Sequence, residues 1–175
     1  ITRNAISQIH NIAASGGFGN TTFRVSANIR ENEGIVTNTG FEQFNSRANI
    51  STRALNDKLK IDFNASFTKR ESSFGNPAVL KYATLFNPTA PIYTEGSSFF
   101  PGTSGNPIGG YFETFGLFDS YNPVSIAEQH DVTGERTELN YNLSLGYDFS
   151  DSFNIQLRAA KQSSQNNNRN YVPVT

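Results

Sequence analysis

The segment Thr22–Arg30 constrains the fold most strongly, because its side chains alternate between apolar and polar without interruption. Phe, Val, Ala and Ile occupy the odd positions from 23 to 29, and Arg, Ser, Asn and Arg occupy the even positions from 24 to 30. Successive side chains of a strand point to opposite faces, so the pattern predicts a strand with one apolar face and one wet face. Such a strand needs an apolar neighbour on one side only.

The same alternation returns at Leu59–Thr68 and at Leu139–Tyr147. Together with weaker alternation elsewhere, it predicts about six strands in one partial domain that spans residues 1–175. We expect these strands near residues 7–15, 21–31, 41–54, 59–70, 135–149 and 153–162. The connections between them are expected to be a Gly-rich turn, a loop of medium length, a four-residue turn, a very long loop and a short turn, at residues 16–20, 32–40, 55–58, 71–134 and 150–152.

The long loop at 71–134 shows no alternation and holds most of the prolines. One short helix is expected there at Ala78–Phe86, directly after Pro77. Loops of this length are usually either functional or disordered. The polar, Asn-rich segment Ser163–Asn170 is expected to be a further loop.

The composition suits a surface that is half apolar and half wet. The hydrophobic content is 36% and the mean hydropathy is -0.46, both low for a packed globular core, yet aromatic residues reach 13%. The net charge of -1 argues against nucleic acid as a partner, and with no cysteine the chain forms no disulfide. No apolar run approaches the ~18 residues of a membrane helix. Because the chain starts at Ile1 without Met or a leader, we expect it to be a piece of a longer protein.

The lengths of the connections alternate between short and long along the chain. Outer-membrane barrels have short turns on the periplasmic side and longer loops outside. The pattern therefore favours an all-β, antiparallel, transmembrane β-barrel segment over a soluble β-sandwich. Since the smallest barrels have about eight strands, other strands must complete the sheet.

The barrel interpretation assigns a role to each face of the strands. A charge placed on the lipid face at mid-bilayer is expected to cost about 2–4 kcal/mol. Residues expected to contact lipid are Phe23, Val25, Ile29, Phe63, Phe67, Leu143, Leu145, Ile155 and Leu157. Residues expected to face the lumen are Arg24, Arg30, Arg47, Arg53, Lys60, Arg70 and Arg158, with Asp62 and Glu138 as counter-charges. This basic wall is expected either to attract anionic groups of a substrate or to pair with carboxylates of neighbouring segments.

Aromatic residues gather in the long loop, where binding groups are often placed. They can stack on sugar rings or form the energetic centre of a protein interface. The alternative, which we expect for most of them, is that they pack the loop onto itself. The candidates for ligand or partner contact are Tyr93, Phe99, Phe100, Tyr111, Phe112, Phe115 and Tyr121.

The sequence predicts no catalytic, metal or cofactor site. His10 and His130 are the only histidines, and neither lies in a recognisable nucleophile motif. The run Glu128–Asp131 is expected to be a solvated loop and not a metal site.

Several segments, in this order and spacing, resemble the SusC/RagA family of TonB-dependent outer-membrane transporters of Bacteroidota. The resemblance covers nearly the whole chain. It is carried by His10–Gly17, Glu33–Val36 with Gly40 and Phe41, Leu55–Lys60, Asn87–Tyr93 and Tyr121–Val124.

This resemblance implies a 22-stranded barrel with an N-terminal plug, of which the chain would be the early barrel strands, with the plug domain absent. It also implies import of glycans or peptides with a SusD-like surface lipoprotein as a lid, driven by the TonB complex through the plug. The expected partners are therefore that lipoprotein, the TonB complex, outer-membrane lipid and an oligosaccharide or peptide. Because a plug fills the lumen in this family, pairing of the lumenal cations with plug carboxylates is favoured.

Two alternatives stay open at this point. The chain could be a secreted β-sandwich lectin or adhesin that binds sugar through Phe99–Tyr121. It could also be a barrel protein captured as a client of assembly or secretion machinery.

Overall fold

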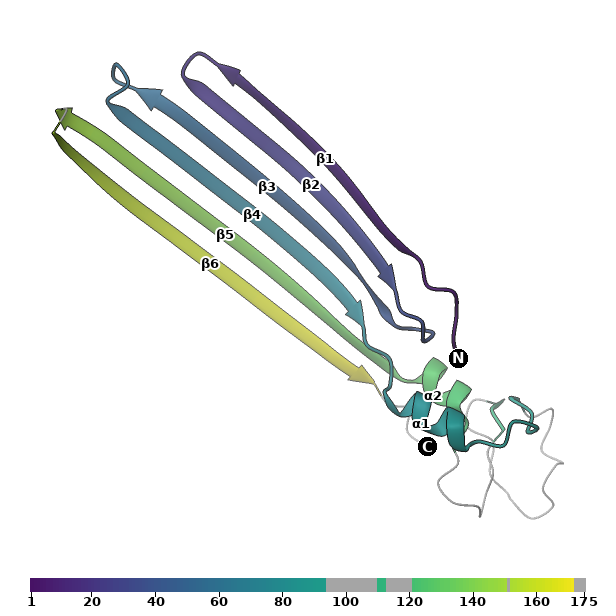
Figure 1. Cartoon of the computed structure of the whole chain (residues 1–175). Helices are drawn as coiled ribbons and strands as arrows, with labels where there is room; N and C mark the ends of the chain where they lie inside the picture. The colour runs from purple at the N-terminus through teal and green to yellow at the C-terminus, as the bar shows by residue number, and fades with distance from the viewer. Residues whose placement is uncertain (94–109, 113–120, 151, 172–175) are drawn as a thin grey trace.

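The computed structural model describes residues 1–93, 110–112, 121–150 and 152–171. It contains one six-stranded antiparallel sheet whose strands are hydrogen-bonded in chain order, β1-β2-β3-β4-β5-β6 (Figure 1). The strands are β1 (Ser7–Phe18), β2 (Thr21–Glu33), β3 (Gly40–Ala54), β4 (Leu59–Ser73), β5 (Asp131–Ser150) and β6 (Phe153–Tyr171). The fold class predicted from the sequence is confirmed, because this all-β architecture fits a β-barrel segment.

Short turns join the strands at one end of the sheet, and the longer connections lie at the other (Figure 1). The longer connection between β4 and β5 contains the helices α1 (Ala78–Leu85) and α2 (Pro123–Gln129). The first helix was predicted at Ala78–Phe86, directly after Pro77, and is confirmed. No sequence signal was recognised for α2, although Asn122 caps it by accepting a hydrogen bond from the backbone N–H of Val124.

Several strands extend beyond the ends that the alternation predicts. The structure ends β4 at Ser73 instead of Arg70 and begins β5 at Asp131 instead of Glu135. The largest correction concerns β6, because the expected loop Ser163–Asn170 is strand and pairs with β5 along its whole length. Alternation marks only the part of a strand that has one apolar face. Beyond that part both faces are wet, while the backbone hydrogen bonds continue.

The first strand is also longer than expected, because Gly16 and Gly17 belong to it and not to the turn. Gly16 lies opposite Phe23 of β2, and a Cβ at Gly16 would come within 3.1 Å of the Phe23 ring. The bare backbone therefore gives the aromatic ring room to lie across the neighbouring strand. The turn itself is reduced to Gly19 and Asn20, with Gly19 at φ +55°.

The strands described here contain no buried residue, and the buried hydrophobic side chains all lie in the connection between β4 and β5. Large apolar side chains of the sheet are exposed instead, including Phe18 at 91% and Leu157 at 63%. Within the described ranges no second sheet covers them. The core that a soluble sandwich requires is therefore missing from this part of the chain.

None of the helices in the described residues is long and apolar enough to cross a membrane.

The turn between β3 and β4 contains three consecutive residues with left-handed backbone: Leu55 (φ 53°), Asn56 (φ 55°) and Asp57 (φ 67°). Asn and Asp tolerate this conformation, whereas Leu is strained in it by ~1 kcal/mol. Because the Leu55 side chain is exposed, Leu55→Gly is expected to raise the free energy of unfolding by up to ~1 kcal/mol. Equilibrium unfolding in urea measures the change.

Ala54→Gly is the matched control for this turn. It places the same residue one position earlier, inside β3, where glycine is expected to lower the free energy of unfolding by ~0.5–1 kcal/mol. A loss of stability in both variants would contradict strain at Leu55.

Candidate functional site

The strand register divides the side chains of the sheet between two faces. One register row joins Phe23, Ile50, Phe63, Leu143 and Ala159 across β2 to β6. We name the face that carries this row the apolar face. The register places on it every residue that the sequence assigned to lipid: Phe23, Val25, Ile29, Phe63, Phe67, Leu143, Leu145, Ile155 and Leu157.

The apolar stretch does not stay level in register from strand to strand. On β2 it covers residues 23–29 and on β6 it covers residues 153–159. Its midpoint on β2, Ser26, is level through successive pairs with Gln162 of β6. The midpoint on β6 is Gln156, so the stretch moves six positions toward the turns over four strand-to-strand steps. The apolar band therefore crosses the sheet obliquely.

Aromatic rings are clustered at the turn end of the band. The ring of Tyr147 lies 4.6 Å from that of Phe149, edge to face, and the Phe149 ring lies 5.5 Å from that of Phe153. Rows of aromatic side chains flank the apolar band of membrane barrels at both interfaces.

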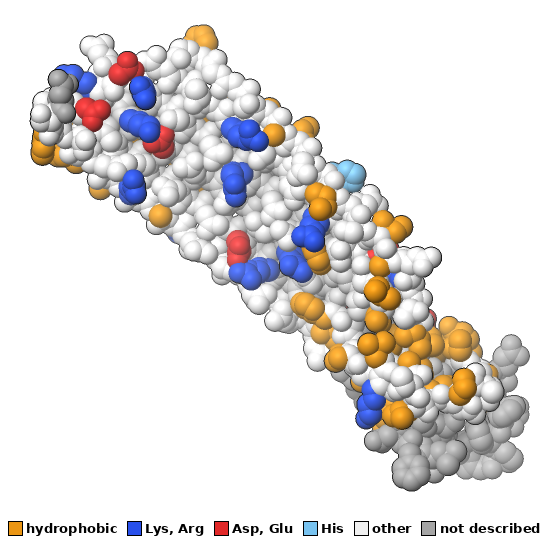
Figure 2. Space-filling view, viewed as in Figure 1, with side chains coloured by type: hydrophobic (Ala, Val, Ile, Leu, Met, Phe, Trp, Pro, Cys, Tyr) orange, Lys and Arg blue, Asp and Glu red, His pale blue; other side chains and the backbone are white. Residues whose placement is uncertain are grey.

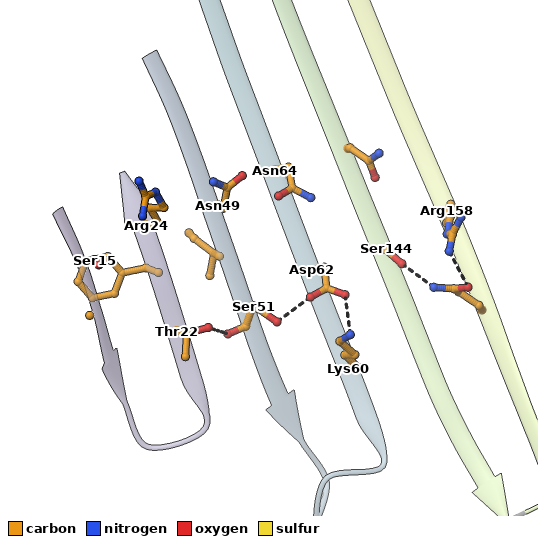
Figure 3. Close-up of a pocket in the computed structure, with 15 residues that line it drawn as sticks. Ser15, Thr22, Arg24, Asn49, Ser51, Lys60, Asp62, Asn64, Ser144 and Arg158 are labelled. Carbon is orange, nitrogen blue, oxygen red and sulfur yellow. Dashed lines mark hydrogen bonds and ion pairs between the residues drawn. The ribbon is translucent and has the colours of Figure 1, made fainter. Parts of the chain in front are cut away.

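The opposite face is polar and hollowed. The register places on it all seven cations that the sequence assigned to the lumen: Arg24, Arg30, Arg47, Arg53, Lys60, Arg70 and Arg158. Figure 2 shows this polar face, where Lys and Arg side chains are spread along the sheet among uncharged polar ones. Near the turns it contains a shallow hollow of about 780 Å³ (Figure 3).

Hydrogen bonds link the side chains at the floor of this hollow (Figure 3). Ser51 Oγ donates to Asp62 Oδ1 at 2.6 Å, and Lys60 Nζ lies 3.6 Å from Asp62 Oδ2. On the other side of the hollow, Arg158 donates to Gln156 at 3.0 Å. The predicted counter-charge Asp62 is therefore already paired within its own strand.

A ladder of asparagines crosses the middle of the polar face, and the sequence analysis missed it. Asn28 donates to Asn11 Oδ1, Asn45 donates to Asn28 Oδ1 at 3.0 Å, and Thr68 donates to Asn45 Oδ1 at 3.0 Å. These four residues occupy one register row over β1 to β4. Only the register could have found them, because the residues are far apart in the sequence. The row gives the face a neutral, hydrogen-bonded belt.

The connection between β4 and β5 forms a small ordered module at the loop end. Val79 of α1 and Ile126 and Ala127 of α2 make its core, against which Ile1, Val36 and Tyr82 also pack. The Asn38 side chain donates to the backbone carbonyl of Ala127 at 2.9 Å, which ties the module to the loop between β2 and β3.

Buried Asn122 holds the module together. Its side-chain amide donates to the carbonyls of Ile92 at 2.8 Å and Phe112 at 3.0 Å, while its oxygen caps α2. One side chain therefore joins three segments of the loop.

The structure separates the predicted contact aromatics into two groups. Tyr111 and Phe112 are buried in the module, whereas Tyr93 and Tyr121 are exposed at 55% and 54%. The Tyr93 and Tyr111 rings lie 5.3 Å apart, and the Tyr121 ring meets that of Tyr82 edge to face at 5.3 Å. The remaining candidates, Phe99, Phe100 and Phe115, lie outside the described residues.

The strongest electrostatic effect in the module is at Tyr111, whose hydroxyl donates a hydrogen bond to Glu128. This bond, burial of the ring and the negative charge of Glu128 all favour the protonated phenol. They raise the pKa of Tyr111 from 10.0 to about 12.

The two histidines lie far apart. The ring of His10 on β1 is exposed and its Nε2 lies 3.3 Å from Gln8 Oε1, whereas His130 Nδ1 lies 2.8 Å from Asn76 Nδ2. In the described part of the chain no three His, Asp or Glu side chains are grouped so as to hold a metal ion.

Comparison with known proteins relates the chain to two curated receptors. It is 31% identical over 96 residues to the TonB-dependent receptor SusC of Bacteroides thetaiotaomicron, covering 54% of this chain and 10% of that protein. It is 36% identical over 93 residues to the TonB-dependent receptor P26 of Formosa agariphila, covering 50% of this chain and 9% of that protein. The chain thus spans about a tenth of the length of the curated relatives that it matches. No family model matches the sequence.

The raised pKa of Tyr111 predicts how the module responds to high pH. An unfolded tyrosine ionises at 10.0 and folded Tyr111 at about 12, so its contribution to stability is complete below pH 10.0 and is lost as the pH rises toward 12. Absorbance of tyrosinate followed against pH is expected to show one late-titrating group that Tyr111→Phe removes. In Glu128→Gln the pKa of Tyr111 is expected to fall toward its usual value. An unchanged late titration in Glu128→Gln would contradict the assigned cause.

Proposed function

We propose that the chain is a piece of a TonB-dependent receptor and that its sheet forms part of the wall of a nutrient importer; its similarity to two such receptors supports this. Receptors of this family are outer-membrane proteins, and in this proposal the chain is a segment of one. In this proposal the six strands within residues 7–171 are early strands of the barrel. The plug and the remaining strands belong to other parts of the receptor.

The exposed apolar face is the observation that carries the proposal. It has no protein cover in the described residues, and its band is oblique. A drift of ~1.5 residues per strand is about 5 Å along the strand for each ~4.8 Å across the sheet, which corresponds to a tilt of ~45° if the band is level in a bilayer. Strands of membrane barrels tilt by about 35–45°.

In this proposal the hollowed polar face lines the lumen. Its asparagine ladder and its cations suit a surface in contact with water, a polar cargo or another polar segment of the receptor. No bond is made or broken by the proposed function. Passage is coupled to the TonB complex through the plug.

The cargo in this proposal is an oligosaccharide or peptide, and a SusD-like lipoprotein covers the barrel from outside. The helical module supports this assignment, because it lies at the loop end and exposes Tyr93 and Tyr121 beside its packed core (Figure 1). Exposed aromatic side chains on a rigid base favour recognition of sugar rings or of a protein partner.

Spin labels at two adjacent positions test the proposed faces. Val25 and Ser26 are neighbours on β2 with opposite directions, and the chain has no cysteine of its own. In the receptor reconstituted in vesicles, a label on Val25→Cys is expected to be relaxed by oxygen, which concentrates in lipid. A label on Ser26→Cys is expected to be relaxed by a water-soluble nickel complex.

A label on Val25→Cys that neither reagent reaches would indicate a buried protein core and would sink the barrel wall. A receptor that stays monomeric in buffer without detergent would also contradict the proposed barrel wall.

Photocrosslinking tests the proposed partner. Benzoylphenylalanine in place of exposed Tyr121 is expected to crosslink the receptor to the SusD-like lipoprotein encoded beside it. The same residue in place of Lys58, in the turn at the other end of the sheet, is expected to give no such product. Crosslinking from both sites, or from neither, would count against a lid at the loop end.

A further inference from the structure

Positive charge is concentrated in one register row of the polar face. Arg30, Gln43, Arg70 and Arg136 lie side by side on β2, β3, β4 and β5, with Arg70 directly opposite Arg136. Like charges placed opposite each other on a sheet are destabilising. The row therefore needs compensation by negative charge.

Two of these cations, Arg30 and Arg70, contact the same aromatic ring, that of Phe41. The guanidinium carbon of Arg70 lies 3.9 Å from the centre of the Phe41 ring, and that of Arg30 lies 5.2 Å from the same centre. On the face shown in Figure 2, blue and orange side chains meet between the middle of the sheet and its helical end. Stacking on a ring holds a guanidinium in one orientation and leaves its N–H edge available.

The carboxylates near the row do not compensate it. Arg136 is paired with Glu138, but neither Arg30 nor Arg70 forms an ion pair with any described residue. The Nε of Arg70 donates to Ser72 Oγ at 3.2 Å. The next register row contains four glutamates, Glu31, Glu42, Glu71 and Glu135, and because it is displaced by one residue they point to the apolar face.

We propose that Arg30, Phe41 and Arg70 form an oxyanion-binding site, and that its ligand is a carboxylate or sulfate group of the imported molecule. The second part rests on the proposed function. A stacked guanidinium presents two parallel N–H groups in one plane, which matches the two oxygens of a carboxylate or sulfate. The ring that fixes both cations also offers an apolar surface to the body of the ligand. Gln43, between the two arginines in the row, adds a neutral donor.

The position of the site favours a group carried by the cargo. It lies at the end of the polar face next to the long connections, while Arg24, Arg53 and Lys60 lie toward the turns. A molecule that moves along this face from the loop end meets Phe41 and its two arginines before Arg24, Arg53 and Lys60. The other source of the same chemistry is a carboxylate of another segment of the receptor, and the experiment separates the two sources.

Binding to the purified full-length receptor tests the site with two pairs of probes. Trigalacturonate is compared with its methyl ester, and sucrose octasulfate with sucrose, by calorimetry at low and high salt. At least one charged probe is expected to bind more tightly than its neutral partner and to weaken with salt. Arg70→Gln is expected to weaken this binding by about tenfold, because hydrogen bonds to charged groups are the strong ones. The affinity of Arg70→Lys for the charged probe is expected to lie between those of the unchanged receptor and Arg70→Gln, since lysine keeps the charge without the planar guanidinium.

Arg24→Gln is the matched control, because Arg24 lies on the same face and strand as Arg30 but stacks on no aromatic ring among the described residues. Equal weakening by Arg24→Gln would overturn the site in favour of a diffuse field. No preference for the charged probes would overturn it as well. A lower melting temperature of Arg70→Gln with unchanged probe binding would indicate that Arg70 pairs with a carboxylate of the receptor. It would overturn the proposal that the ligand is a group of the imported molecule. None of these outcomes affects the spin-label test, so the barrel wall and the site fail independently.

Discussion

The structure depends on the backbone hydrogen-bond register that joins all six strands from β1 to β6, with one shift between Asp148 and Ser150 in β5. Each strand alternates two kinds of side chain, and only a matched register gathers the alternation of six strands into two continuous faces. A slip of one residue at any ladder would send arginines to the apolar face and phenylalanines to the polar one. The asparagine ladder adds side-chain hydrogen bonds across four strands on the polar face, and the Gly16–Phe23 contact packs β1 against β2.

The order of the strands and their two faces could be predicted from the sequence, because a period of two is visible over nine or ten residues in β2, β4 and β5. The ends of the strands could not. Where both faces are wet, as in the Asn-rich half of β6, only pairing with β5 identifies a strand. The asparagine ladder, the Phe41 site and the fold of the helical module depend on contacts between residues far apart in the chain. Asn122 next to Pro123 was a visible helix-start signal that went unused.

The two ends of the sheet are built by different means. At the turn end, short connections and clustered aromatic rings follow directly from local sequence. At the loop end, a small core of Val79, Ile126 and Ala127 is tied to the loop between β2 and β3 through Asn38 and Val36. Among the described residues, this module is the part with buried hydrophobic side chains, as in the core of a soluble protein. Buried polar contacts, above all those of Asn122, hold its segments together.

Because the apolar band crosses the sheet obliquely, residues in one register row do not lie at the same level of the band. In an upright sheet they would. Lys161 lies in the same register row as Val25, Ala65 and Tyr141, but the apolar stretch of β6 covers residues 153–159, so Lys161 lies beyond it on the loop side. In the proposed barrel, with strands tilted by ~45°, that row rises toward the outer side of the bilayer from β2 to β6. The proposal therefore places Lys161 near the lipid headgroups and not in the hydrocarbon. In that arrangement, the depth of a residue in the bilayer, and not its register row, decides which substitutions the apolar face tolerates.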